Sequence, residues 1–428
     1  MHRTLAHAAT LVLAVSLLAA CGGDDADPAA APPPAGSPPP VGSPPPVGSP
    51  PPAPATTVTI SGILTAPDAA TPIANALVYV KDSSAPPTAT TAGPLAELPC
   101  GTPPTASWAS ACTGADGRFT LPASVPTATP TLVAVKGAFT QEQVLNVTAA
   151  GPLDVGTVAL AAASGARLAV VTGAYDRIQD VLAKLGYGQV ANGMLVEGTE
   201  TFVQYLGDSA TPVGNQQPAA ALFVDGDGDG KADIYRYGVV FFNCGLDVSL
   251  IASAQNVATL QAYVQAGGRI YVSDQAYDIV EQTFPAYLDF EGETATAADQ
   301  PEAPGAALLG DSDIEVSATV DASLAAWLQG VSCAGGPCVA AGRAHIEGFL
   351  SGWAVMAGLH PALQAQVKVW ASGPVTFGQG AAVDRPLTVT FTHGQGRVTY
   401  TSYHAEPGTG MTGLLPQERI LQFLVFEL

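Results

Sequence analysis

Hydrophobic and polar positions change their spacing along the chain, and the clearest pattern lies between Tyr237 and Glu281. An apolar run, "YGVVFFNCG", is followed by an amphipathic segment that ends in a Gly pair and by a second apolar run, "RIYVSDQAYDIVE". This succession is typical of a strand–helix–strand–helix unit in a parallel α/β sheet. Such sheets bind ligands beyond the carboxyl ends of their strands. Here the strands end at 243–245 and 273–275, so we expect a ligand near these residues.

The surrounding residues, 161–428, continue this pattern and predict an α/β domain with a parallel sheet. "ARLAVVTG" indicates a buried first strand, "TFVQYL" a short strand, "LTVTFTHGQGRVTYTSYHAE" a hairpin and "QERILQFLVFEL" a closing helix. The segment from about 291 to 343 is rich in Ala, Gly and Asp and indicates an insertion. Core-facing helix positions recur at helical spacing. They are Ile178, Val181, Leu182 and Leu185 in the first helix, and Val257, Leu260 and Val264 in the helix of the central unit.

Residues 57–160 show short apolar or alternating runs separated by Pro, Gly, Asp and Thr clusters. This pattern predicts an all-β sandwich. Asp116 and Gly117 would form a tight turn, after which Phe119 would point into the core. "TPIANALVYV" and "TGADGRFTL" resemble the carboxypeptidase regulatory-like (transthyretin-like) family. The resemblance implies an accessory module, and no site residue is carried over from it.

The first residues predict export and a lipid anchor. Arg3 precedes an apolar run from Ala9 to Ala20, and "LAAC" resembles the bacterial lipobox, so residues 1–21 read as a lipoprotein signal peptide with Cys21 as the lipidated residue. An ordinary cleaved signal followed by a chance Cys is the alternative. Gly22 follows the Cys where an Asp would favour inner-membrane retention, so we expect the cell envelope of a Gram-negative bacterium, most simply its outer membrane.

Residues 22–56 form a Pro-rich stretch in which "GSPPPV" recurs. Pro triplets hold the backbone in polyproline II without internal hydrogen bonds, so this stretch predicts a disordered stalk. A ligand for Pro-recognising domains is the alternative.

Charge restricts the partners. The chain of 428 residues carries 15 Lys and Arg against 36 Asp and Glu, a formal charge of −21. Phosphate backbones would repel such a chain, so nucleic acid is not expected as a partner, and cations are.

The spacing of the six cysteines groups four of them into two pairs. Cys100 with Cys112, and Cys333 with Cys338, predict two disulfides in an exported protein. With Cys21 lipidated, Cys244 remains as the odd thiol.

A candidate calcium loop spans 225–233, "DGDGDGKAD". Carboxylates at loop positions 1, 3, 5 and 9, a backbone carbonyl at 7 and Gly at 6 suit an oxygen-coordinated Ca²⁺ ion. The predicted ligands are Asp225, Asp227, Asp229, the Lys231 carbonyl and Asp233, and the role of the ion would be structural. Arg236 stands where an EF-hand has its bidentate Glu, and an acidic turn without an ion is the alternative.

Three segments, "YGVVFFNCG", "GGRIYVSDQAYDIVE" and "GRVTYTSYHAE", resemble the class I glutamine amidotransferase-like superfamily, near its trehalose-utilisation-type members. The resemblance implies a three-layer flavodoxin-like fold. Catalytic members carry a GxCxG nucleophile elbow and a later HxE motif. His404-Ala405-Glu406 fits the second motif, but Gln275 stands where the nucleophilic Cys should be. The resemblance therefore implies a domain that lacks the nucleophile for glutamine amidotransfer.

Each candidate site residue has two interpretations. Cys244 is a relocated nucleophile activated by His404, or it is apolar packing. Asp274 is a general base or nucleophile, or it is a helix N-cap. His404 and Glu406 are a catalytic dyad, or they are relics or part of a ligand pocket.

The sequence thus predicts a surface-anchored lipoprotein that presents a non-catalytic amidotransferase-like domain for binding an envelope carbohydrate or peptide. The competing hypothesis is an envelope hydrolase or amidase that uses His404 and Glu406 with Cys244 or Asp274. Fold analogy alone names no substrate.

Overall fold

The computed structural model describes residues 54–85, 94, 98–160, 167–208, 216–292, 300–349, 352–405 and 413–428. Pro52–Leu428 form one compact unit. The expected lipidation site Cys21, residues 22–53 of the Pro-rich stretch and Glu406 lie outside the described residues. Among the residues that are described, no helix has both the length and the apolar character that a membrane span requires.

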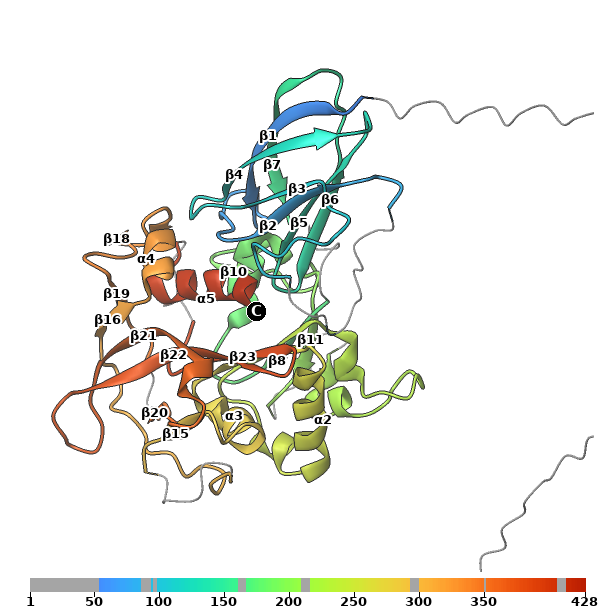
Figure 1. Cartoon of the computed structure of the whole chain (residues 1–428). Helices are drawn as coiled ribbons and strands as arrows, with labels where there is room; N and C mark the ends of the chain where they lie inside the picture. Colours follow the sequence, from blue (N-terminus) through green and yellow to red (C-terminus); the bar gives the residue numbers. More distant parts are fainter. Residues whose placement is uncertain are drawn as a thin grey trace, which may run out of the picture. The chain divides into compact units, whose positions relative to one another are not determined.

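The all-β region consists of two sheets (Figure 1). Buried residues of both sheets belong to one hydrophobic core. One sheet has the order β4-β1-β7 and the other the order β3-β2-β5-β6. Buried and exposed residues alternate strictly along β4, where Phe119 is buried as predicted. Two sheets around one core are what a sandwich requires. The strands are β1 (Thr56–Thr65), β2 (Leu77–Lys81), β3 (Ala109–Cys112), β4 (Arg118–Val125), β5 (Thr131–Lys136), β6 (Phe139–Val144) and β7 (Gly151–Ala159).

Both predicted disulfides are confirmed. Cys100 and Cys112 have their Cα atoms 5.7 Å apart, and Cys333 and Cys338 have theirs 5.1 Å apart. The second bridge closes a small hairpin of β17 (Ser332–Cys333) and β18 (Gly336–Pro337). Cys244 is a free, buried thiol.

A mixed ten-stranded sheet forms the second region, in the order β12-β11-β8-β13-β14-β23-β22-β21-β16-β19. Pairing is parallel from β12 to β23 and antiparallel from β23 to β19. The strands are β8 (Leu168–Thr172), β11 (Val203–Leu206), β12 (Gln217–Pro218), β13 (Val239–Phe242), β14 (Arg269–Ser273), β16 (Val316–Val320), β19 (Arg343–Ile346), β21 (Val367–Val375), β22 (Val383–His393) and β23 (Gly396–Thr401).

The parallel part is the predicted strand–helix–strand–helix unit, with α2 (Ala254–Gln265) after β13 and α3 (Asp278–Thr283) after β14. Its strands are buried on both faces. Val239 and Phe241 of β13 belong to one core, and their neighbours Val240 and Phe242 belong to the other. Helices α2 and α3 pack on the second face, and α1 and α5 contribute to the core of the first.

Helix α1 (Ile178–Leu182) continues into a wider π-helical turn (Ala183–Tyr187), and its predicted core face is fully buried. Gly186 lies inside this turn with a φ of +95°, a non-helical angle that Gly adopts readily. The segment 291–343 is more regular than its composition indicates, because β16 and α4 (Ala322–Leu328) lie in it and β16 joins the main sheet. Buried and exposed residues alternate along "VSATV", as in a strand with one buried face.

The remaining short elements connect these parts. They are β9 (Val190–Ala191), β10 (Met194–Leu195), β15 (Leu288–Phe290), β20 (Met356–Leu359), and 3₁₀ turns at Ala219–Phe223, Asp233–Arg236, Val248–Ile251, Asp274–Tyr277 and Gln364–Gln366.

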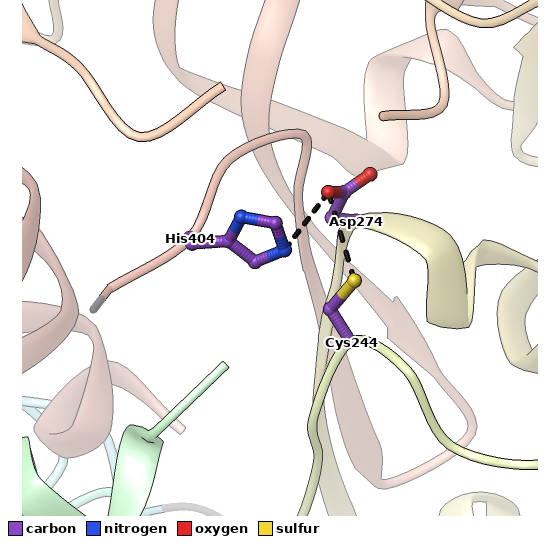
Figure 2. Close-up of side chains that lie close together, drawn as sticks. All are labelled: Cys244, Asp274 and His404. Carbon is purple, nitrogen blue, oxygen red and sulfur yellow. Dashed lines mark hydrogen bonds and ion pairs between the residues drawn. The ribbon is translucent and has the colours of Figure 1, made fainter. Parts of the chain in front are cut away.

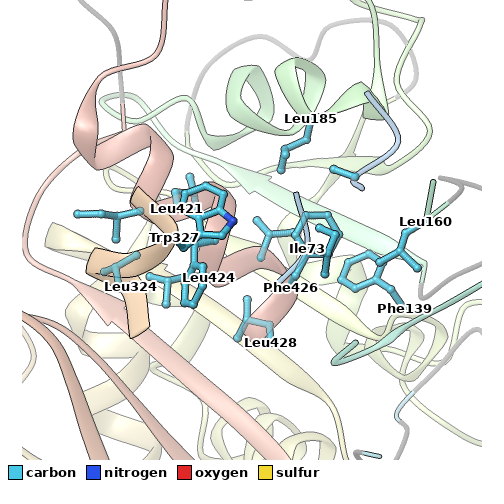
Figure 3. Packing of buried hydrophobic residues seen from close by; sticks show 14 of the residues in the cluster. Ile73, Phe139, Leu160, Leu185, Leu324, Trp327, Leu421, Leu424, Phe426 and Leu428 are labelled. Carbon is cyan, nitrogen blue, oxygen red and sulfur yellow. The ribbon is translucent and has the colours of Figure 1, made fainter. Parts of the chain in front are cut away.

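The closing helix α5 (Pro416–Glu427) packs against both regions (Figure 3). Its Phe426 ring lies 5.0 Å from the Phe139 ring of the all-β region. Glu427 pairs with Lys136 at 2.5 Å, and the buried Glu418 pairs with Lys184 at 2.6 Å. Apolar contact supplies most of the stabilisation, because it removes large side chains from water, whereas the ion pairs mainly satisfy charges that are already buried.

Replacing Phe426 by Ala should lower the free energy of unfolding by about 3–5 kcal/mol, because it empties a packed space between the two regions. Urea unfolding measures the change. Val144→Ala is the control, since this side chain is 65% exposed and should shift stability by no more than about 0.5 kcal/mol. Equal effects of the two substitutions would show that α5 does not hold the regions together.

Candidate functional site

Three neighbouring parallel strands end at one edge of the mixed sheet, and each end is followed by a candidate site residue. Cys244 follows β13, Asp274 follows β14 and His404 follows β23. Because β13 pairs with β14 and β14 with β23 in parallel, the three side chains meet (Figure 2). The strand ends 243–245 and 273–275, near which the sequence predicts a ligand, lie side by side.

The three side chains contact one another directly. His404 Nε2 lies 3.0 Å from Asp274 Oδ2, within ion-pair distance, although its N–H direction is not that of a well-formed hydrogen bond. Cys244 Sγ lies 3.7 Å from the same oxygen. Their exposed fractions are 1% for Cys244 and Asp274 and 2% for His404. This group is called the Cys–Asp–His cluster below.

Asp274 does not serve as a helix N-cap, contrary to the structural interpretation of its sequence position. Its side chain accepts no hydrogen bond from the turn that follows; Oδ1 accepts from the distant backbone N–H of Ala354 at 2.9 Å. Its φ of +45° is in the left-handed region, which a non-Gly residue seldom occupies. Tyr400 Oη donates to its carbonyl at 3.2 Å, which supports the strained turn from β23.

Hydrogen bonds from further residues orient the cluster. His404 Nδ1 lies 3.2 Å from the carbonyl oxygen of Gly348, and since a carbonyl only accepts, Nδ1 carries a proton. The Cys244 N–H donates to Ser273 Oγ at 2.9 Å. Asp176 Oδ1 accepts from the N–H of Ala405 at 3.1 Å.

Sequence reasoning missed Asp176, and with it Asn243, whose Nδ2 donates to the Asp176 carbonyl and to Gln179 Oε1. A signal was present. Asp176 follows the first parallel strand of the sheet, β8, and therefore belongs to the same edge as the other strand ends.

Burial and neighbouring charges together shift the pKa values of the cluster. It raises the pKa of the Cys244 thiol far above its ordinary value, and the Asp274 carboxylate raises it further. Burial also raises the pKa of Asp274, although His404 opposes this shift. Burial by itself would lower the pKa of His404, but Asp274, Asp176 and the Gly348 carbonyl together raise it. Burial therefore favours the neutral thiol of Cys244 over a thiolate nucleophile, and the neighbouring carboxylates favour a proton on His404.

The acidic loop is only partly arranged as predicted. The carboxylates of Asp225, Asp227 and Asp229 come within 4.8 Å of one another, and all three residues are exposed. Asp225 accepts the N–H groups of Gly228, at 2.7 Å, and Gly230, at 2.9 Å. The carboxylate of Asp233 instead lies 3.6 Å from the guanidinium of Arg236, which follows the loop.

Next to the cluster, α3 carries two buried acids that sequence reasoning also missed. Glu281 Oε1 accepts the N–H of Glu302 at 3.0 Å, and both oxygens of Asp278 accept the N–H of Gly305 at 3.2 Å. Burial, with the charges of Glu302, Asp278 and Asp289, raises the pKa of Glu281 to about 7.

Glu281→Gln should stabilise the protein at pH 8 and leave its stability unchanged near pH 4. The folded pKa of Glu281 exceeds the ordinary value of 4.5, so wild-type stability is lost as pH rises from 4.5 through about 7, and the neutral amide avoids this loss. The expected gain at pH 8 is about 1–3 kcal/mol in urea unfolding. Curves that differ by the same amount at both pH values would exclude a titrating Glu281.

No protein-family model and no curated protein matches the chain. Among solved structures, a 9R-lipoxygenase from Cyanothece PCC8801 is 19% identical, with 24% of this chain and 16% of the lipoxygenase covered and a TM-score of 0.16. A cytoplasmic protein from Salmonella typhimurium is 9% identical, with 60% and 97% of the chains covered and a TM-score of 0.28. A second, from strain LT2, is 11% identical, with 61% and 96% covered and a TM-score of 0.26. Likenesses at this level carry no functional argument.

Proposed function

We propose that the chain is an envelope lipoprotein whose mixed α/β region is a flavodoxin-like, amidotransferase-related domain that binds a ligand and does not carry out Cys-dependent amide hydrolysis. The observation that carries this proposal is the chemistry of the strand-end cluster. Its one thiol, Cys244, is buried beside a carboxylate that keeps it protonated.

The turn after β14 supports the same conclusion. In a nucleophile elbow the reactive side chain stands on the sharp, strained strand-to-helix turn. The strained residue in this turn is Asp274, with its positive φ, and Gln275 follows it. Neither residue supplies the thiol of glutamine amidotransfer, and the cluster brings no thiolate to this position.

A role in ligand binding agrees with the remaining features. The parallel sheet carries polar groups at its carboxyl edge, where α/β sheets bind ligands. The all-β region, which resembles an accessory module, is packed onto the same unit through α5. An envelope carbohydrate or peptide is the ligand class we propose, because export, a lipid anchor and a stalk would present the domain to such molecules.

A second candidate function, an envelope hydrolase, is favoured by one observation, the strained backbone of Asp274. Strain in a buried polar residue is typical of functional sites. Asp274 would act as the nucleophile or general base, with His404 as its partner at 3.0 Å. The near-complete burial of both side chains weighs against this function.

An assay of glutamine hydrolysis distinguishes ligand binding and envelope hydrolysis from the amidotransferase reaction. The purified protein should release no ammonia from glutamine, because the site holds no thiolate. Release that Asp274→Asn leaves intact and Cys244→Ser abolishes would restore the amidotransferase reaction. Hydrolysis of an envelope ester or amide that Asp274→Asn abolishes and Cys244→Ser leaves intact would favour the hydrolase.

The anchor is tested by Cys21→Ala. Because lipidation of this residue is the proposed attachment, the variant should move from the membrane fraction to the soluble fraction. Fractionation followed by immunoblotting measures the distribution, with Cys244→Ser as a matched control that keeps the anchor. A Cys21→Ala variant that remains in salt-washed membranes would contradict the lipoprotein assignment.

We also propose that the 225–233 loop binds calcium. The close approach of three carboxylates supports it, since they repel one another without a cation, and oxygen ligands at about 2.3–2.6 Å are those that Ca²⁺ prefers. The competing contacts of Arg236 with Asp227, at 3.8 Å, and Asp233 weaken the site.

Calcium should raise the thermal midpoint of the wild-type protein, because binding to the folded state stabilises it in proportion to the logarithm of ligand concentration. Asp227→Ala should abolish this response. Scanning calorimetry with millimolar calcium or chelator measures the midpoints, and Asp247→Ala serves as the control outside the loop. Equal thermal midpoints of the wild-type protein in calcium and in chelator would contradict the proposed calcium site.

A further inference from the structure

We propose that Cys244, Asp274 and His404 together bind one transition-metal ion of the zinc class, through Cys244 Sγ, a carboxylate oxygen of Asp274 and His404 Nε2. The proposal does not depend on membrane anchoring or on the envelope ligand. It concerns a different place from the acidic loop, which offers oxygen ligands alone.

The spacing of the ligand atoms suits such an ion. A tetrahedral zinc ion holds sulfur at about 2.3 Å and nitrogen or oxygen at about 2.0–2.2 Å, which places the ligand atoms roughly 3.3–3.6 Å from one another. In the cluster, Sγ lies 3.7 Å and Nε2 lies 3.0 Å from Asp274 Oδ2. One ligand atom from each residue lies within 4.8 Å of the others. Shifts of a few tenths of an ångström would complete the coordination.

The surrounding hydrogen bonds are those that support metal ligands. A metal-binding His donates its other ring N–H to a carbonyl or carboxylate, which fixes the tautomer and aims the free nitrogen at the ion. His404 Nδ1 meets the Gly348 carbonyl in this way, so Nε2 is the nitrogen aimed into the cluster. Oxygen Oδ1 of Asp274 is held by the Ala354 N–H, which leaves Oδ2 facing the cluster.

Buried polar atoms around the cluster lack partners. Among the described residues, His404 Nε2, Asp176 Oδ2 and Asn243 Oδ1 have no hydrogen-bond partner, although all three residues are at least 98% buried. Such atoms are costly when nothing satisfies them. With Nδ1 protonated, a neutral His404 beside an ionised Asp274 would place two lone pairs, on Nε2 and Oδ2, only 3.0 Å apart, so a proton or a metal ion must lie between them.

A proton would satisfy this pair alone, whereas a divalent cation binds all three ligand atoms, including Cys244 Sγ at 3.7 Å from Asp274 Oδ2, and offsets the charges of Asp274 and Asp176. Thiolate and imidazole select zinc over calcium or magnesium. Binding displaces the thiol proton of Cys244 and any proton on His404 Nε2 to solvent, so uptake is favoured at higher pH. Because the cluster is buried, the ion enters as the chain folds.

The test uses the full chain carrying Cys21→Ala, in which Cys244 is the one cysteine outside the two disulfides. The protein is refolded with zinc, and in parallel with cobalt, and weakly held metal is removed by gel filtration. We expect about one zinc ion per chain by mass spectrometry, together with a thiolate-to-cobalt charge-transfer band and the visible spectrum of tetrahedral cobalt.

Adding Cys244→Ser should remove the charge-transfer band and weaken zinc binding by at least about 100-fold, more than is lost when only a supporting hydrogen bond is removed. The matched control is His345→Ala, which breaks the exposed Glu315–His345–Glu347 group and should retain the metal and the band. If Cys244→Ser fails to fold, the presence or absence of the thiolate-to-cobalt band in the parent protein tests the proposal. Absence of the band in the folded parent, or zinc that Cys244→Ser retains and His345→Ala loses, would overturn the proposal.

Discussion

The parallel pairing of β13, β14 and β23 is the constraint on which the site depends. Strands that run in one direction end at one edge, so residues 30 and 130 positions apart in the sequence become neighbours there. Because all three strands are buried on both faces, their ends are buried as well, and polar groups at this edge must satisfy one another. Burial raises the pKa values of Cys244 and Asp274, whereas the neighbouring acids raise the pKa of His404 against the effect of burial.

A second consequence is that the site depends on packing far from it. Helix α5 covers one face of the sheet and contacts the all-β region through Phe426 and Phe139. Its buried Glu418 pairs with Lys184, in the turn that follows α1, and Asp176 lies just before α1. Loosening α5 would therefore disturb the edge at which Asp176 faces the cluster, although no residue of α5 belongs to it.

Hydrophobic spacing was sufficient to predict the central α/β unit, the core face of α1, the hairpin and the closing helix, because local periodicity records which side of an element is buried. Cysteine spacing was sufficient for both disulfides. The contribution of β16 was missed because its small residues resemble a loop, and the order of strands in the sheet is set by long-range pairing that no local pattern records.

The three residues of the cluster could be predicted from the sequence, but their contacts and protonation could not. One of the two interpretations of Asp274 was a helix N-cap, since Asp after a strand often has this role, but its φ is positive and its carboxylate contacts Cys244 and His404. That backbone angle and the burial that protonates the thiol depend on tertiary packing. Gly348 and Ala354, which orient the cluster, contribute only backbone atoms, and backbone contacts leave no side-chain signature in a sequence.

The central claim is that Cys244 is a protonated thiol held by a buried carboxylate, and its rate of alkylation tests this most directly. Iodoacetamide is applied across a range of pH to the folded Cys21→Ala protein in chelator, and the modified peptide is quantified by mass spectrometry. The account predicts that Cys244 is alkylated at least about tenfold more slowly in the folded protein than in the unfolded chain, at every pH below the pKa of an ordinary thiol. Rapid alkylation of the folded protein at neutral pH, abolished by His404→Gln, would reveal an ionised thiolate–imidazolium pair and contradict the account.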